Sequence, residues 1–269
     1  SMLGRRRPVK VATRRMDYPL RRGAVSRWLY GRAVDSVVVI SDAIGAAIRR
    51  AGVPEQSIIR IYEGVDSEEL EGVAGCRAEV LARFDWPTDA VVILCAASLR
   101  PRKGQIHLLR AFAGIANGHP RARLLLAGEG DERNALQAEI VRLGLGDQVL
   151  MPGQMPRREV LGVADIACIP SQLEGLSVFS LESMAVGLPV IASRVGGLPE
   201  GVVDGETGVL VEPGDVAGFA AALDLLLSDP ELSRKMGEAG GARARASFSA
   251  RMMAEKTERL YEELIASVK

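Results

Sequence analysis

The chain has 269 residues, and at about 150 residues per domain this length predicts two domains. Hydrophobic residues make up 48% and charged residues 25%, which excludes a disordered chain, a collagen and a coiled coil. Three scattered cysteines and two histidines exclude a disulfide framework and a His-rich metal centre, and sparse cysteine favours a reducing cytoplasm. The longest apolar stretch, Ala90 to Leu99, is too short to cross a bilayer, which takes about 20 residues.

The net charge of zero conceals an uneven distribution along the chain. Residues 1–50 carry 12 Lys and Arg against 3 Asp and Glu, whereas residues 51–269 carry 22 against 31. Two explanations fit this excess of positive charge in residues 1–50. One is an arginine-rich solvated surface, and the other is contact with phosphate or with an anionic membrane surface at the inner face of a membrane. The basic stretch contains no recognisable nucleic-acid-binding motif, so we do not expect nucleic acid as a partner.

The first part of the chain predicts a short βαβ arrangement. Ser41 and Asp42 supply an N-cap for a helix from Ala43 to Ala51, and residues 67–88 turn acidic and lose the strand pattern, which predicts a hinge. Strands alternating with helices indicate a parallel sheet. The strands are expected over Val9 to Thr13, Ser36 to Ile40, and Ile58 to Tyr62.

A longer alternating series follows and predicts an open doubly wound sheet with helices on both faces. Such sheets bind ligands beyond the carboxyl ends of their strands, and most of the Gly, Pro and polar clusters of this half fall there. Strands are expected over Val91 to Ala97, Arg123 to Ala127, Gln148 to Met151, Ile166 to Ile169, Val190 to Ala192, and Gly208 to Val211. Helices are expected over 105–117, 132–143, 156–163, 179–186, 216–227, 230–246, and 250–268.

The segment Gly128 to Arg133 (GEGDER) follows a strand and opens a helix, as the phosphate loop of a dinucleotide-binding fold does. Arg133 replaces the third glycine of that motif. The acidic residue that should end the next strand is also missing, because Asp147 precedes that strand. Hydride transfer is therefore disfavoured, and the sequence contains no GxxxxGK[ST] loop.

A cluster of cations stands between a predicted strand and the helix that follows it. Lys103 and Gly104 lie there with Arg100 and Arg102 close by. Cations at a helix N-terminus suit a phosphate or diphosphate, because the free N–H groups and the helix dipole add to their charge. The alternative is a set of exposed loop cations without a ligand.

Glu174 and Glu182 form a pair of carboxylates eight residues apart in the segment EGLSVFSLE. Gly175 places Glu174 in a loop and Glu182 in the first turns of a helix. Two carboxylates beside a sugar suit a hydrolase, in which they lie about 5 to 10 Å apart. They equally suit a site that holds sugar hydroxyls, because an ionised carboxylate is a strong acceptor. A helix-surface role for Glu182 is disfavoured by its apolar neighbours Leu181 and Met184.

The stretch Pro170 to Val211 (PSQLEGLSVFSLESMAVGLPVIASRVGGLPEGVVDGETGVLV) resembles the donor-site block of family-4 retaining glycosyltransferases of the GT-B fold. Glu174 and Glu182 match the Glu-x7-Glu element of that family. The resemblance implies an α/β fold in three parts: a truncated βαβ remnant of the acceptor domain over residues 1–72, a doubly wound, Rossmann-like donor domain over 73–249, and a C-terminal crossover helix over 250–269. Four further segments agree in order and spacing: Leu99 to Gly104, Leu124 to Gly130, Val149 to Gly153, and Ile61 to Asp66.

The resemblance also implies roles for individual residues. Lys103 and Glu174 would be catalytic, with Lys103 on the donor diphosphate and Glu174 on the hydroxyls of the donor sugar. Glu182 would hold the ribose hydroxyls. The family usually needs no metal, and we expect no cofactor besides the nucleotide-sugar substrate. The diphosphate would be bound by Arg102, Lys103, Ser177 and Val178, and the nucleoside by Glu182, Gly128, Gln154 and Met155.

Three features depart from the family pattern. Ser98 stands where the family usually has an arginine, five residues before Lys103. Glu63 replaces the usual Asn of the hinge motif, and a carboxylate there would repel phosphate unless it points away. Most of the first half, with its acceptor-side histidine, has no counterpart in the sequence, so we expect the isolated chain not to transfer sugar.

These observations predict a retaining glycosyltransferase, or its donor-binding part, that moves a sugar from a UDP-linked donor to a glycan or lipid-linked acceptor in glycoconjugate or surface-polysaccharide synthesis. The alternatives are an inactive nucleotide-sugar binding module that needs a partner chain, and a GT-B epimerase or hydrolase. We expect the first strands to be covered by the helix over 250–268, or to form a homodimer contact through a strand edge or through Trp28 and Leu29.

Overall fold

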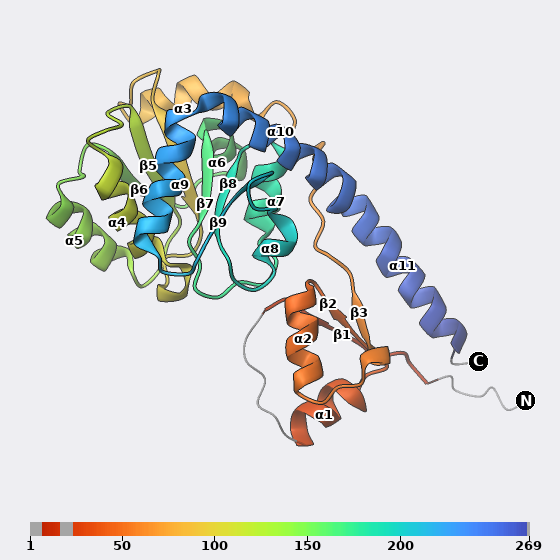
Figure 1. The fold of residues 1–269 in the computed structure, drawn as a ribbon. Helices are drawn as coiled ribbons and strands as arrows, with labels where there is room; N and C mark the ends of the chain where they lie inside the picture. Colours follow the sequence, from red (N-terminus) through yellow and green to blue (C-terminus); the bar gives the residue numbers. More distant parts are fainter. Residues whose placement is uncertain (1–6, 17–23, 268–269) are drawn as a thin grey trace, which may run out of the picture.

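The computed structural model describes residues 7–16 and 24–267. These residues form two parallel sheets, one with three strands and one with six (Figure 1). We call residues 7–16 and 24–66, which contain the first sheet, the small unit, and residues 73–247, which contain the second, the large unit. The predicted α/β class with parallel sheets is confirmed.

The small unit is a three-stranded parallel sheet in the order β1-β2-β3, with two helices. Ser41 is the predicted N-cap, since its Oγ accepts a hydrogen bond of 3.2 Å from the Ile44 N–H. Register is set by apolar pairs such as Val37 opposite Ile58. The elements are β1 Val11–Arg14, α1 Ala24–Gly31, β2 Ser36–Val39, α2 Asp42–Arg50, and β3 Ile58–Arg60.

The large unit is built on a six-stranded parallel sheet in the order β6-β5-β4-β7-β8-β9. The chain moves outward from β4 to β6 and then returns to the other side of β4 with β7, so the direction of winding reverses between β4 and β7. That reversal leaves a crevice at the carboxyl ends of these two strands. The strands are β4 Val91–Ala96, β5 Ala122–Ala127, β6 Val149–Gly153, β7 Ile166–Ile169, β8 Val190–Ser193, and β9 Gly208–Val211.

Helices cover both faces of this sheet because its strands are apolar on both sides. Val92 and Leu94 belong to one buried cluster, and Ile93 and Cys95 to the other. The described helices of the large unit are α3 Arg77–Arg83, α4 Gln105–Ile115, α5 Arg133–Leu143, α6 Arg157–Val163, α7 Val178–Ala185, α8 Leu198–Gly201, α9 Val216–Ser228, and α10 Pro230–Ser247. Short 3-10 turns occupy Glu55–Ser57 in the small unit and Val73–Cys76 and Pro101–Lys103 in the large unit.

Helix α11 (Ala250–Ser267) leaves the large unit and runs along the small one (Figure 1). Just before it, the Val65 N–H donates to the Phe248 carbonyl at 2.8 Å, which ties the hinge to the end of α10. Leu260 then packs against Val38 of β2 and against Ile61, which directly follows β3. The expectation that the C-terminal helix covers the first strands is therefore confirmed.

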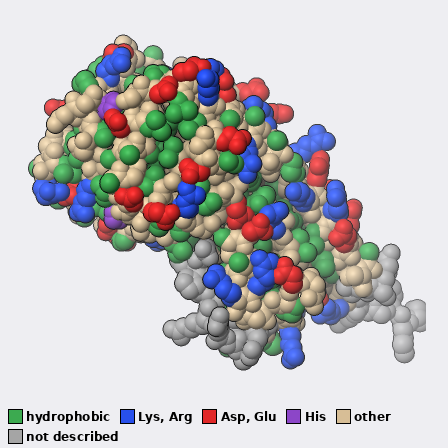
Figure 2. Space-filling model, in the orientation of Figure 1, with side chains coloured by type: hydrophobic (Ala, Val, Ile, Leu, Met, Phe, Trp, Pro, Cys, Tyr) green, Lys and Arg blue, Asp and Glu red, His purple; other side chains and the backbone are tan. Residues whose placement is uncertain are grey.

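The surface carries positive and negative side chains interspersed over the face seen in Figure 2. Trp28 and Leu29 of α1 are 60% and 44% exposed, and the predicted homodimer contact through them stays a prediction. Within the described ranges, no helix has the length and hydropathy needed to span a membrane. Part of the basic stretch, namely Arg5, Arg6, Arg21 and Arg22, lies outside the described residues.

Candidate functional site

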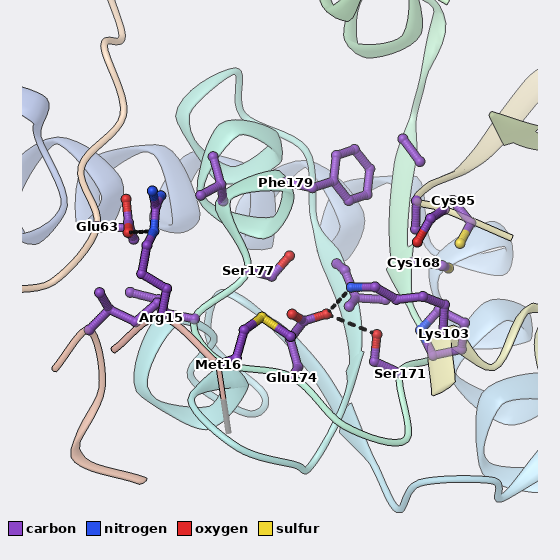
Figure 3. A pocket seen from close by; sticks show the side chains of 18 residues that line it. Arg15, Met16, Glu63, Cys95, Lys103, Cys168, Ser171, Glu174, Ser177 and Phe179 are labelled. Atoms are coloured by element: carbon purple, nitrogen blue, oxygen red, sulfur yellow. Dashed lines mark hydrogen bonds and ion pairs between the residues drawn. The ribbon is translucent and has the colours of Figure 1, made fainter. Parts of the chain in front are cut away.

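A pocket of about 360 Å³ opens where β4 and β7 diverge (Figure 3). One wall comes from residues that follow these two strands and from the start of α7, as expected for a doubly wound sheet. The opposite wall comes from the small unit, through Arg15, Met16, Ile40 and Glu63. The pocket therefore lies between the two units.

Lys103 is held in this pocket by the tight turn that joins β4 to α4. Gly104 follows it with φ of +68°, and a Cβ there would lie 2.0 Å from the Pro170 carbonyl oxygen, so the turn requires glycine. The Gln172 N–H also donates to the Arg102 carbonyl at 2.7 Å. These contacts dock the β4 turn against the loop after β7.

Glu174 is the ion-pair partner that this docking gives to Lys103. The Lys103 Nζ lies 2.5 Å from Glu174 Oε2, and the Ser171 hydroxyl donates to the same oxygen at 3.1 Å. Glu174 is only 6% exposed, so its charge depends on these partners. Its backbone is fixed by Gly196, whose φ is +56° and where a Cβ would lie 1.8 Å from the Glu174 carbonyl oxygen.

Helix α7 begins at the pocket. Ser177 is its N-cap and accepts a hydrogen bond of 3.3 Å from the Ser180 N–H. Ser177, Val178 and Phe179 line the pocket, so the start of the helix faces it. The first N–H groups of a helix have no partner inside the helix, and its dipole is positive at this end. This wall is therefore suited to an anionic ligand.

On the opposite wall, Arg15 forms an ion pair with Glu63, with Arg15 Nε 2.6 Å from Glu63 Oε1. Glu63 is 9% exposed and is itself one of the residues that line the pocket. Its charge is compensated by Arg15. Sequence reasoning did not identify Arg15 as a pocket residue, and the only signal was its place directly after the first strand.

The predicted site residues separate into two groups. Lys103, Glu174, Ser177 and Val178 line one pocket. The remaining predicted residues, namely Arg102, Gly128, Gln154, Met155 and Glu182, are not part of that lining.

Glu182, for example, accepts from Arg157 Nη1 at 2.8 Å, while Arg157 Nη2 reaches Glu69 at 2.8 Å. Gly128 donates its N–H to the Gly153 carbonyl at 2.8 Å. Gln154 is exposed, whereas Met155 packs on the core.

Arg102 lies outside this lining although it is next to Lys103 in the sequence. Its Nη1 is buried and meets no hydrogen-bond partner within the described part of the chain. The roles assigned to all these side chains remain predictions.

Two cysteines form part of the pocket wall, but neither is suited to nucleophilic chemistry. Burial raises the pKa of the Cys95 thiol to about 12, and it raises the pKa of the Cys168 thiol well above its ordinary value. Both thiols are therefore protonated near neutral pH. Across residues 7–16 and 24–267, no group of three or more His, Cys, Asp and Glu side chains is placed to hold a metal ion.

The strand order and the pocket at the switch point define a doubly wound α/β protein with a pocket beyond the carboxyl ends of its strands, the place where such sheets bind ligands. Residues 77–243 match the family model for Glycosyl transferases group 1, and the chain belongs to this family. The resemblance to GT-B glycosyltransferases predicted from the sequence is thereby confirmed.

Individual relatives agree with this assignment. The chain is 32% identical over 232 residues to a GDP-mannose-dependent α-(1-6)-phosphatidylinositol monomannoside mannosyltransferase of Mycolicibacterium smegmatis, covering 82% of this chain and 60% of that relative. The structure of sucrose-phosphate synthase from Thermosynechococcus elongatus aligns with a TM-score of 0.80 and 31% identity, over 90% of this chain and 61% of that one. Anabaena Alr3699/HepE, solved in complex with UDP, has a TM-score of 0.83 at 23% identity and shares the fold, over 94% of this chain and 72% of that one. The chain thus spans about three fifths of the first two of these proteins.

Proposed function

We propose that this chain is the donor-binding part of a retaining glycosyltransferase that uses a nucleoside diphosphate sugar. The observation that carries the proposal is the Lys103–Glu174 pair, held at the switch point beside the start of α7. A cation and helix N–H groups suit a diphosphate, and a buried carboxylate suits sugar hydroxyls.

In the proposed reaction the anomeric C–O bond to the diphosphate breaks and its electrons go to the departing diphosphate. An acceptor hydroxyl forms the new C–O bond to the same anomeric carbon and gives its proton to the departing phosphate oxygen. Lys103 and the N–H groups at the start of α7 stabilise the charge that develops there. Glu174 accepts hydrogen bonds from the donor sugar, with Ser171 holding the carboxylate in place. Lys103 exchanges its partner when the donor binds, from Glu174 in the free protein to a phosphate oxygen.

The nucleoside is proposed to lie beyond the pocket, towards α6. Glu182 would accept from the ribose hydroxyls, and Gly128, Gln154 and Met155 would lie near the base. These four residues lie outside the lining of the pocket that contains Lys103 and Glu174, which supports this division.

UDP is our first choice of nucleotide, since HepE was solved with UDP, and GDP is the second, since the mycobacterial relative is named for GDP-mannose. The acceptor is proposed to be a glycan or a lipid-linked sugar, because that relative's name specifies a phosphatidylinositol mannoside.

The parts of the chain are assigned accordingly. We propose acceptor-side residues over 1–72, the donor-binding domain over 73–249 and the crossover helix over 250–269. The basic residues near the N-terminus support contact with an anionic membrane surface at the cytoplasmic face.

A thermal-shift panel with UDP, GDP, ADP and their sugars tests the proposal. Ligand at 100 times its Kd adds about 2.7 kcal/mol of stability. At about 2–4 °C per kcal/mol for a chain of this size, one nucleotide should raise the Tm by roughly 5–10 °C. Lys103→Ala should lose most of that shift, whereas Lys235→Ala, which removes an exposed lysine on α10, should keep it. A panel without any shift would contradict the proposal.

A further inference from the structure

The pocket contains two cations, one from each unit. Among the described residues that line it, only Lys103 and Arg15 carry positive side chains. Arg100 and Arg102, which flank Lys103 in the sequence, are not part of the lining. A diphosphate carries at least two negative charges at neutral pH, and Lys103 compensates one of them. The second cation available inside the pocket is therefore Arg15.

Arg15 forms an ion pair with Glu63 in which Nε lies 2.6 Å from Glu63 Oε1. Among the residues that the structure describes, no hydrogen bond or ion pair joins Arg15 to any other partner. The terminal Nη1 and Nη2 groups form the fork that binds phosphate in a bidentate manner. The Arg15 side chain is 61% exposed, against 11% for Glu63, and Arg15 lines the pocket, so its side chain is open to a ligand.

Arg15 is also fixed relative to the large unit. A Cβ on Gly175 would lie 2.6 Å from the Arg15 carbonyl oxygen, so the backbone after β1 contacts the loop that carries Glu174. Figure 3 shows Arg15 and Lys103 on opposite sides of Ser177. An anion at the start of α7 would thus have one cation on each side.

We propose that Arg15 is a second diphosphate-binding residue, supplied by the small unit across the cleft. This inference rests on the proposed function. Glu63 orients the Arg15 guanidinium and compensates its charge while the pocket is empty of donor. Ser98, on the large-unit side of the pocket, contributes a neutral side chain, so the cation comes from the small unit instead. Donor binding then links the two units through one diphosphate.

Calorimetric titration of the whole chain with UDP or GDP, whichever the wild type binds, tests this inference. Arg15→Gln should weaken binding by about 10-fold or more, the range for a lost charge-assisted hydrogen bond, and leave uridine or guanosine binding unchanged. Arg7→Gln is the matched control, because Arg7 is 63% exposed, pairs with Asp35 in the same unit and lies outside the pocket lining. The Arg15→Gln/Ser98→Arg variant should regain at least half of the lost binding free energy, because position 98 is exposed and lines the same pocket. Circular dichroism and Tm confirm that each variant is folded.

The outcomes separate the two proposals. A wild-type chain that binds no nucleoside diphosphate overturns the proposed function and this inference with it. Nucleotide binding that Arg15→Gln leaves within twofold of wild type overturns only the role of Arg15. An equal loss in Arg7→Gln would show a general charge effect and also overturn that role. A loss confined to the sugar-bearing donor would place Arg15 on the sugar and contradict the diphosphate assignment.

Discussion

Removing Lys103 should destabilise the free protein through the charge that it leaves behind on Glu174. Without Lys103, the Ser171 hydroxyl is the one side-chain donor left to the carboxylate among the described residues, at a site that is 6% exposed. Breaking a fully buried pair in this way costs about 3–5 kcal/mol. Lys103 itself is 16% exposed and the pair borders an open pocket, so we expect a smaller cost of about 2–3 kcal/mol.

A double-mutant cycle measures this coupling. Lys103→Met should lower the free energy of unfolding in urea by that amount, whereas Lys103→Met/Glu174→Gln should return to within about 1 kcal/mol of wild type, because no buried charge is left unpaired. The Tm of Lys103→Met should fall by roughly 5–10 °C. A Lys103→Met variant as stable as wild type would refute the reasoning, since it would show that loss of the ion pair leaves no costly unpaired charge.

The remaining predictions concern the turn, the pH dependence and the division of roles. Gly104→Ala should cost more than Gly144→Ala in thermal unfolding: both glycines have φ of +68°, which costs a Cβ-bearing residue about 1–2 kcal/mol, but only Gly104 faces a carbonyl at 2.0 Å. Hydrogen bonds from the Leu210 backbone N–H and from Arg194 lower the pKa of the Asp204 carboxyl in the folded protein. The ionised carboxylate therefore stabilises the fold above the ordinary carboxyl pKa, and this stabilisation is lost as the pH falls through the lower pKa of the folded state. Asp204→Asn should therefore reduce stability by about 0.5–1 kcal/mol at pH 7, discounted for its exposure, and hardly at all near pH 2; an equal effect at both would contradict this. Glu182→Ala should weaken UDP and UDP-sugar binding alike, whereas Glu174→Ala should weaken only the sugar-bearing donor, and calorimetry showing the same loss of UDP affinity in both would end the division.

The sequence predicts the large unit well because its strands are buried on both faces. Strands β7 and β9 have the predicted bounds, and the other strands of that sheet end within two residues of the expected positions. Three short helices, α1, α3 and α8, were missed. Helix α1 is eight residues long in an arginine-rich stretch, α8 is a single turn of four residues, and α3 lies in the segment assigned to the hinge, where Val80 and Leu81 turn out to be buried.

The candidate site could be predicted only in part from the sequence. Lys103 and Glu174 follow β4 and β7, and the carboxyl ends of adjacent parallel strands meet at one edge of the sheet. Their pairing could therefore be expected from chain order alone. Arg15 could not be placed this way, because its position depends on how the small unit packs against the loop at Gly175 and on α11, which are long-range contacts.

A crystal structure of this chain with its preferred nucleoside diphosphate tests the central claim most directly. The account predicts the diphosphate in the pocket between β4 and β7, within hydrogen-bond distance of Lys103 Nζ and of N–H groups at the start of α7, with the Lys103–Glu174 contact lengthened. A nucleotide bound elsewhere, or one whose phosphates point away from Lys103, would contradict it.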